Sequence, residues 1–244
     1  MPQWMFWMPS DATWHSLLWF SLTLWGVHVF TSLGASAFFH WMHRREILPH
    51  QRVAAGAEPS AALRRAAWRE RALGHPVLLL LTGMVVYPLF VWTGGNLSSP
   101  LPTPGMLILQ LLGCAIINDT VFYWSHRCLH HRRLFRLIHR QHHTFRHVRP
   151  VSSEYAHPVE NLFNLIALYA GPLLLGCPFP VWVIWVFLRI VETCDAHSGY
   201  QFDPIASKHA FHHLHPTKGC YGTGLGLWDG LMRTDRDWRE AQVL

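Results

Sequence analysis

Positions 125–143 read SHRCLHHRRLFRLIHRQHH and hold two histidine boxes, His126-x-x-x-His130 and His139-x-x-His142-His143. Residues three and four apart lie on the same face of a helix. Each box can therefore direct two or three imidazole rings at one point in space. Because neutral imidazole is the commonest metal ligand among side chains, this run predicts a metal site.

A third box, His209-x-x-His212-His213, repeats the spacing of the second. Two more histidines stand in distinctive settings, His157 in the run EYAHP and His197 in the run DAHSGY. The total is ten candidate ligands, whereas a structural zinc site needs four. We therefore expect more than one metal ion. Nitrogen-rich sites suit iron, copper, nickel or zinc, and the absence of an HExxH motif disfavours a zinc protease.

The composition predicts a membrane protein. Half of the 244 residues are apolar and 13 are tryptophan, a residue that gathers at membrane interfaces. The sequence predicts an all-α integral membrane bundle of about five spans, in which the last two form either a deep hairpin or full crossings. A two-span region with a basic loop (1–105) then precedes a histidine-bearing region (106–244) within one structural domain. The apolar runs cover residues 14–39, 76–92, 106–124, 159–175 and 181–191.

Basic residues indicate which side of the membrane each connection occupies. Nineteen of the 20 Lys and Arg lie between the first and second runs, between the third and fourth, or after the fifth. With five spans, these segments share one side by parity, and the positive-inside rule makes it cytoplasmic. All ten candidate histidines lie there too. The membrane would be the inner membrane of a bacterium or the endoplasmic reticulum of a eukaryote. We read the net charge of +6 as a topology signal and expect no nucleic-acid partner.

Acidic residues near the boxes are candidates to orient ligands. Asp119 lies two helical turns before His126 inside an apolar run, where an acid is costly and usually functional. We expect it to hydrogen-bond a ligand histidine, and helix packing is the alternative. Glu154 and Glu160 are weaker candidates for the same role.

Other features have plainer interpretations. Residues 59–74 fit an amphipathic surface helix or a solvated helix. His15 and His28 interrupt the first span and are read as hydrogen-bonded packing residues. The five cysteines, odd in number and without a CxxC pair, are read as unpaired thiols. The N-terminus is read as retained, with residues 1–10 at the membrane interface.

The text around the boxes is more specific than their spacing. The runs LIHRQHH, EYAHPVE, DAHSGY and WDGL resemble the fatty acid hydroxylase/sterol desaturase superfamily, in particular its C4-methyl sterol oxidase branch. The resemblance covers about residues 106–235. The chain departs from the pattern at Ala210, where an Asp is usual, at Cys220 in place of Asn, and at Met232-Arg233 before Thr234 in place of Phe-Gly.

The resemblance implies a non-haem di-iron monooxygenase that uses O2 and external electrons. It implies a membrane lipid substrate, best a sterol-like C4 methyl group, and an electron donor such as a ferredoxin or a cytochrome with its reductase. Fatty-acyl, ornithine-lipid or carotenoid substrates are alternatives. Zinc can replace iron in such a site during purification. The implied ligands are the eight box histidines with His197 and His157, while His131, His147 and His215 have no box position.

Two interpretations from other classes remain open at this stage. A divalent-metal transporter needs ionisable groups along its spans, whereas these spans hold little beyond Asp119. Haem held by two histidines needs only pairs of them and would show a Soret band. Clustering of the histidines on one side favours the oxidase over both.

Overall fold

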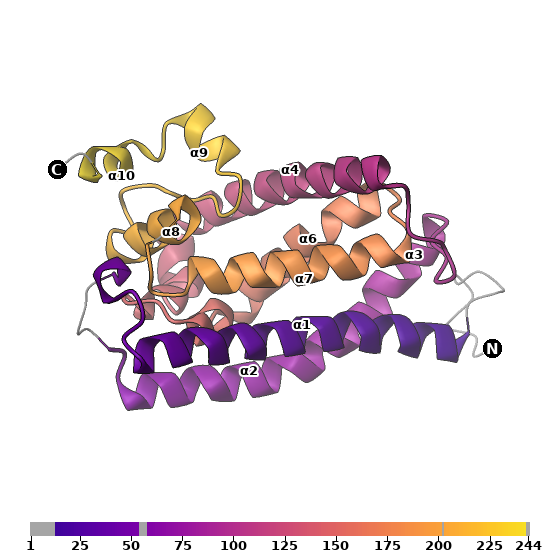
Figure 1. The fold of residues 1–244 in the computed structure, drawn as a ribbon, viewed down its shortest axis with the longest axis horizontal. Coiled ribbons are helices and arrows are strands. Elements are labelled where there is room, and N and C mark those ends of the chain that lie inside the picture. Colours follow the sequence, from indigo (N-terminus) through magenta and orange to yellow (C-terminus); the bar gives the residue numbers. More distant parts are fainter. Residues whose placement is uncertain (1–12, 54–57, 202, 243–244) are drawn as a thin grey trace.

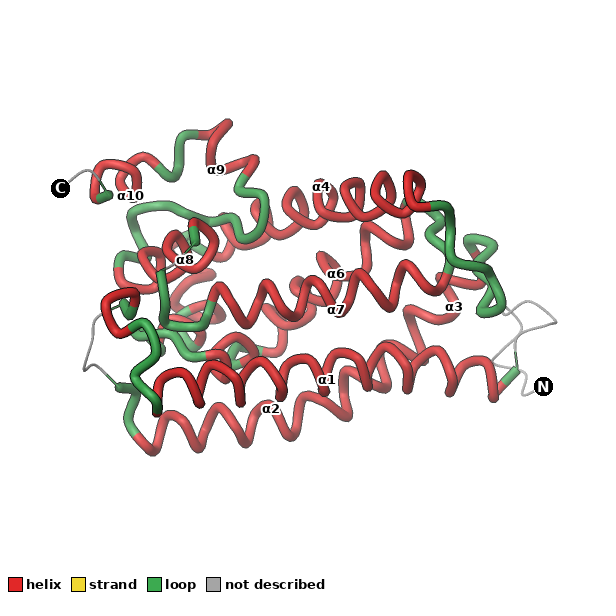
Figure 2. The backbone as a smooth tube through the Cα atoms, in the orientation of Figure 1, coloured by secondary structure: helices red, strands yellow, loops and turns green. Residues whose placement is uncertain are grey.

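A computed structural model describes residues 13–53, 58–201 and 203–242. These residues form an all-helical bundle, in which the only β pairing is an isolated bridge between Arg52 and Tyr200 (Figures 1 and 2). The predicted interfacial segment 1–10 lies outside the described residues. Five long helices are α1 (Trp14–Arg44), α2 (Ala61–Leu81), α4 (Pro104–Leu129), α6 (Pro158–Leu174) and α7 (Phe179–Ala196). Five short ones are α3 (Tyr87–Trp92), α5 (Arg132–Leu134), α8 (Pro204–Leu214), α9 (Leu227–Met232) and α10 (Arg236–Ala241).

Three helical segments are long and apolar enough to cross a membrane: Trp14–Arg44, Ala61–Trp92 and Pro104–Leu129. The chain is therefore an integral membrane protein. Helices α6 and α7 have 17 and 18 residues and run antiparallel along the bundle (Figure 1). At 1.5 Å per residue each is about 26 Å long, close to the thickness of a hydrocarbon core. The predicted count of five crossings stays a prediction.

The second span differs from its prediction. We expected either an amphipathic surface helix or a solvated helix over residues 59–74, and a separate span from Pro76. Instead α2 begins at Ala61, contains Pro76, and continues through a π-helical turn into α3. The reason is visible at Arg71, which is 2% exposed and pairs with Glu154 inside the bundle. The side of α2 that carries Arg71 is thus held against the protein, while the other arginines of the helix are exposed.

The basic segments lie at one end of the bundle. The α1–α2 connection, the segment after α4, and α8 with α10 are all at the left of Figure 1. The start of α1, the α3–α4 connection and the α6–α7 turn are at the right. This is the alternation that the charge pattern predicts. Assignment of the basic end to the cytoplasm stays a prediction.

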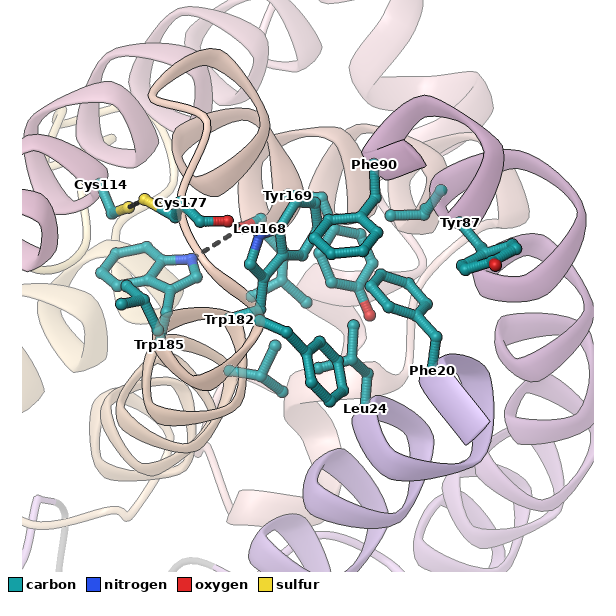
Figure 3. Close-up of a cluster of buried hydrophobic side chains, with 14 of the residues drawn as sticks. Phe20, Leu24, Tyr87, Phe90, Cys114, Leu168, Tyr169, Cys177, Trp182 and Trp185 are labelled. Carbon is teal, nitrogen blue, oxygen red and sulfur yellow. Dashed lines mark hydrogen bonds between the residues drawn. The ribbon is translucent and has the colours of Figure 1, made fainter. Parts of the chain in front are cut away.

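An aromatic core fills the opposite end, around the middle helix α7 (Figure 3). The ring of Phe20 lies 4.9 Å from that of Phe90 and 5.6 Å from that of Trp182, centroid to centroid. The indole of Trp182 donates to the carbonyl of Cys177, and that of Trp185 donates to the carbonyl of Leu168. This end therefore satisfies its own polar atoms, as an apolar environment requires.

Two of the plainer interpretations are confirmed and one is wrong. All five cysteines are free thiols. His28 is hydrogen-bonded to Glu154 inside the bundle. His15 is exposed and does not pack there as predicted.

Candidate metal centre

The three histidine boxes meet at the basic end of the bundle. His126 lies in the last turn of α4, and His130 ends that helix. The third box lies on α8, as its spacing predicts. The second box was expected on one continuous helix, and that expectation is wrong. Its residues occupy a π-helical turn, Phe135–His139, and a 3-10 turn, His142–Thr144.

The second and third boxes divide their rings between two groups in the same way, although the third box lies on one regular helix. In the second box, His139 and His143 share a group and His142 joins the other. On α8, His209 and His213 are four apart and share a group, while His212 joins the other. Both boxes thus contribute to two sites rather than one.

Nine of the ten candidate histidines form two groups, in each of which the nearest ring nitrogens all lie within 4.8 Å of one another. The groups touch, since the ring centroids of His143 and His213 are 4.7 Å apart. We call them the five-histidine group and the four-histidine group. The first comprises His126, His130, His139, His143 and His212, and the second His142, His197, His209 and His213.

The rings are neutral. All nine are buried except His130, which is half-buried. Burial lowers the pKa of His142 and of His212 to about 4, and that of His197 to about 3. Neutral imidazole is the form that binds a metal ion.

Backbone carbonyls fix which ring nitrogen carries the proton. His126 Nδ1 lies 2.7 Å from the carbonyl oxygen of Tyr221, and His212 Nδ1 lies 2.7 Å from that of Gly219. A carbonyl only accepts, so each Nδ1 must donate and each Nε2 must carry a lone pair. The same holds for His213 with Phe145, His197 with Thr193 and His142 with Tyr155. The sequence did not predict these partners, because a residue of any type can supply a backbone carbonyl.

The bare nitrogens converge, which is the observation that fits a metal. His139 Nε2 lies 2.9 Å from His126 Nε2, 3.0 Å from His130 Nε2 and 2.9 Å from His143 Nε2. One nitrogen carries at most one proton, so it cannot satisfy three neighbours. Lone pairs facing one another in a buried site repel unless a cation lies among them. His209 Nε2 is similarly close to those of His197 and His213, at 3.0 and 3.1 Å.

The predicted acids differ in what they do. Glu160 Oε2 lies 2.9 Å from His139 Nδ1, so this weaker candidate is the one beside a box histidine. Asp119 does not bond a histidine as expected. Its oxygens accept from the backbone N–H groups of Gly226 and Leu227, 3.0 and 3.1 Å away, at the start of α9. Asp119 thereby holds the loop whose Tyr221 carbonyl accepts from His126 Nδ1, so its effect on His126 is indirect.

The remaining candidates lie outside both groups. His157 precedes α6, and its Nδ1 accepts from the Val159 N–H at 3.2 Å, a helix-capping contact. Glu154 accepts from His28 and His75 rather than from a box histidine. Of the histidines without a box position, His131 and His215 are exposed and His147 is half-buried.

A cavity of about 540 Å³ adjoins the histidines. His126, His142, His197 and His209 form part of its wall, and apolar side chains from α2, α4, α6 and α7 form much of the rest. Its exposed lining residues come from α2 and α6 alone. We infer that the cavity opens sideways between these two helices. The exposed residues are Leu73, Gly74 and Val77 on α2, and Pro158, Asn161 and Leu162 on α6.

The family model for fatty acid hydroxylases matches residues 111–234. A very-long-chain aldehyde decarbonylase of Oryza sativa subsp. indica is 36% identical over 185 residues, which cover 70% of this chain and 69% of that protein. Methylsterol monooxygenase 2-1 of Arabidopsis thaliana is 34% identical over 196 residues, 70% and 72% of the two chains. Methylsterol monooxygenase 1 of Danio rerio is 36% identical over 150 residues, 57% and 51%. No solved structure matches significantly.

Proposed function

Because the chain belongs to the fatty acid hydroxylase family, we propose that it is a membrane-bound non-haem di-iron monooxygenase that oxidises a membrane lipid. The chain is an oxidoreductase of the membrane, and the proposal concerns its metal and its substrate. The observation that carries the proposal is the convergence of bare imidazole nitrogens in two adjoining groups at the wall of an apolar cavity.

Each histidine group holds one iron ion in this proposal. The five-histidine and four-histidine groups are the ligands, His157 caps α6, and zinc can take the place of iron on aerobic purification. The iron pair supplies reductive activation of O2, with electrons from outside the protein. The division of the chain into a two-span region, 1–105, and a histidine-bearing region, 106–244, stays part of the proposal.

The protein's own groups bind, orient and exclude water. The carbonyls of Tyr221 and Gly219 keep the protons of His126 and His212 on Nδ1, so that Nε2 stays free to bind. Glu160 Oε2 lies 2.9 Å from His139 Nδ1 and would orient that ring. Leu78, Leu165 and other apolar residues in the cavity bind the hydrocarbon of the lipid and keep bulk water from the reacting carbon.

The proposed substrate is a sterol-like lipid oxidised at a C4 methyl group. Similarity to methylsterol monooxygenases supports this choice. The aldehyde decarbonylases of rice support a second candidate, a long-chain aldehyde. The histidine boxes would bind the metal ions that activate O2, so they do not distinguish the sterol from the aldehyde. Fatty-acyl, ornithine-lipid and carotenoid substrates are alternatives within the same family.

The basic end is the proposed cytoplasmic face and the docking surface for an acidic electron donor, such as a ferredoxin or a cytochrome. Four exposed arginines surround the second box: Arg132, Arg133, Arg136 and Arg140. Contact with lipid headgroups and a topology signal are the other roles open to these side chains.

The test combines metal and product. Protein purified without O2 is expected to hold two iron ions per chain. Addition of O2, reductant and membrane lipid extract is expected to give an oxygenated lipid whose new oxygen comes from labelled O2. Separate arms with a 4-methylsterol and with a long-chain aldehyde distinguish the two substrate candidates. Fewer than one iron per chain after reconstitution, with no oxidised lipid, would sink the proposal, and a Soret band would point to haem.

A further inference from the structure

A second polar cluster lies on the wall of the same cavity, away from the box histidines. It joins His28 of α1, Arg71 and His75 of α2, and Glu154 of the segment between α5 and α6. Glu154 is its centre. None of these four residues belongs to a histidine box, and the proposed metal chemistry uses none of them.

The cluster is balanced in charge. Arg71 Nε lies 3.1 Å from Glu154 Oε2, and its Nη2 lies 3.3 Å from Oε1. Burial alone would raise the pKa of Glu154, but hydrogen bonds from His28 and His75 and the charge of Arg71 hold it well below its usual range. One carboxylate therefore faces one guanidinium.

The donors of the cluster are used within the protein. Arg71 also donates to the Ser36 hydroxyl and to the Pro150 carbonyl. Glu154 accepts further from the Ser32 hydroxyl at 2.7 Å. Four of the five N–H groups of Arg71 and both oxygens of Glu154 are thus engaged, so the two imidazoles are the groups with most capacity left for a ligand.

Each imidazole has one ring nitrogen left for a ligand. The Nε2 atoms of His28 and His75 lie 3.3 and 2.9 Å from Glu154 oxygens. An ionised carboxylate only accepts, so each Nε2 must donate to it, which leaves the Nδ1 atom of each ring for another partner. His28 Nδ1 is buried and has no partner within the described chain. The hydrogen bonds among described residues give His75 Nδ1 none either. A buried polar atom without a partner is costly, and a hydroxyl group, which can both donate and accept, would remove that cost at His28.

We propose that the cluster binds the hydroxyl group of a lipid through the Nδ1 atoms of His28 and His75. Residues of this cluster and of the metal centre line the same cavity. A lipid entering between α2 and α6 would hydrogen-bond its hydroxyl group to the cluster while its hydrocarbon fills the cavity. This inference rests on the proposed function for its substrate class, and it narrows that class to lipids that carry a free hydroxyl. His75 is a positioning residue in this scheme.

The experiment compares lipids that differ only in the hydroxyl group. Iron-loaded protein in nanodiscs is equilibrated with a radiolabelled 4-methylsterol or its 3-deoxy counterpart, and with hexadecanol or hexadecane. One neutral hydrogen bond predicts about fivefold tighter binding of the hydroxyl form in at least one pair. His75→Phe should reduce that ratio to about 1 and leave the iron content unchanged. The exposed control His131→Phe should keep the full ratio.

A conservative variant separates recognition from packing. In His75→Gln the amide can donate to Glu154 while its oxygen accepts, so part of the preference should return. The inference is overturned if the unaltered protein shows no preference in either pair, or if His75→Phe weakens both members of a pair equally. It is also overturned if the protein binds a third metal ion that His75→Phe loses. The comparison in the unaltered protein needs no variant, so it holds even if His75→Phe does not fold.

The outcomes for the two proposals are distinct. Lipid oxidation without a hydroxyl preference removes this inference and leaves the monooxygenase. A hydroxyl preference that depends on His75, in protein that oxidises no lipid, supports this inference and removes the monooxygenase.

Discussion

The two ends of the bundle are built on opposite principles. At the aromatic end, Phe20, Phe90 and Trp182 are no more than 1% exposed and pack ring against ring. At the histidine end, His139, His209 and His212 are equally buried, but their neighbours are other imidazoles. The first end buries apolar surface, and the second buries lone pairs.

The two ends therefore differ in whether their stability depends on a bound ligand. Apolar burial contributes about 25 cal/mol per Å² of surface without any partner. Buried imidazoles that face one another lose hydration and gain nothing until a cation binds. An ion that binds only the folded chain adds its binding free energy to stability. We therefore expect the aromatic end to fold on its own contacts and the histidine end to depend on metal.

The largest effect is expected from the removal of one ligand histidine. His142→Ala takes one ring from the four-histidine group. The iron content is expected to fall from two per chain to one or fewer, and lipid oxidation to fall below detection. Iron analysis and turnover with labelled O2 measure both.

The matched control is His131→Ala, since His131 is an exposed histidine five residues after His126 in the same segment. It should keep both iron and activity. Equal losses in the two variants would mean that the ligand assignment is wrong.

Acid should separate the two ends in metal-free protein. The pKa values of His142 and His212 are about 4 because of burial, below about 6.5 in an unfolded chain. Between these values the unfolded chain binds more protons, so stability falls as pH falls. Each such histidine contributes up to about 1.4 kcal/mol per pH unit. Hydrogen exchange at pH 7 and 5.5 should show the histidine end opening first. Earlier opening of α7 near Trp182 would contradict this.

The sequence predicted the features that rest on repeated histidine spacing, on alternating basic segments or on long apolar runs. Spacing of the boxes placed eight histidines at one end, and alternation of basic segments predicted that end correctly (Figure 1). Long apolar runs predicted α1 and α4 because burial in lipid needs no particular partner.

Predictions failed where a long-range contact decides. The second box occupies a π-helical turn and a 3-10 turn where one helix was expected, whereas the third box, with the same spacing, lies on a regular helix. Arg71 draws α2 into the bundle through Glu154, a partner 83 residues away. Asp119 serves the loop before α9 rather than the histidines two turns along its own helix.

Loss of aromatic packing should affect the other end alone. Trp182→Ala removes a ring that contacts Phe20, Phe90 and Tyr169, and the expected loss is about 3–5 kcal/mol of unfolding free energy. Iron content at low temperature should not change. Trp92, which is 76% exposed, gives the control Trp92→Ala, with an expected loss within about 0.5 kcal/mol. Unfolding in detergent measures both, and loss of iron from Trp182→Ala below its unfolding temperature would show that the two ends are coupled.

The smallest effect is expected from the acid beside a ligand. Glu160→Gln keeps the size of the side chain but replaces a carboxylate 2.9 Å from His139 Nδ1 with an amide. Groups that orient metal-bound histidines are typically worth about 10- to 100-fold in metal affinity. Competition with a chelator should show that loss in one of the two iron ions, while the unfolding free energy of the metal-free protein changes little. The exposed Glu58→Gln is the control and should retain both affinities. If Glu160→Gln also retains them, the carboxylate only fills space beside His139, and the five-histidine group is held by its backbone carbonyls.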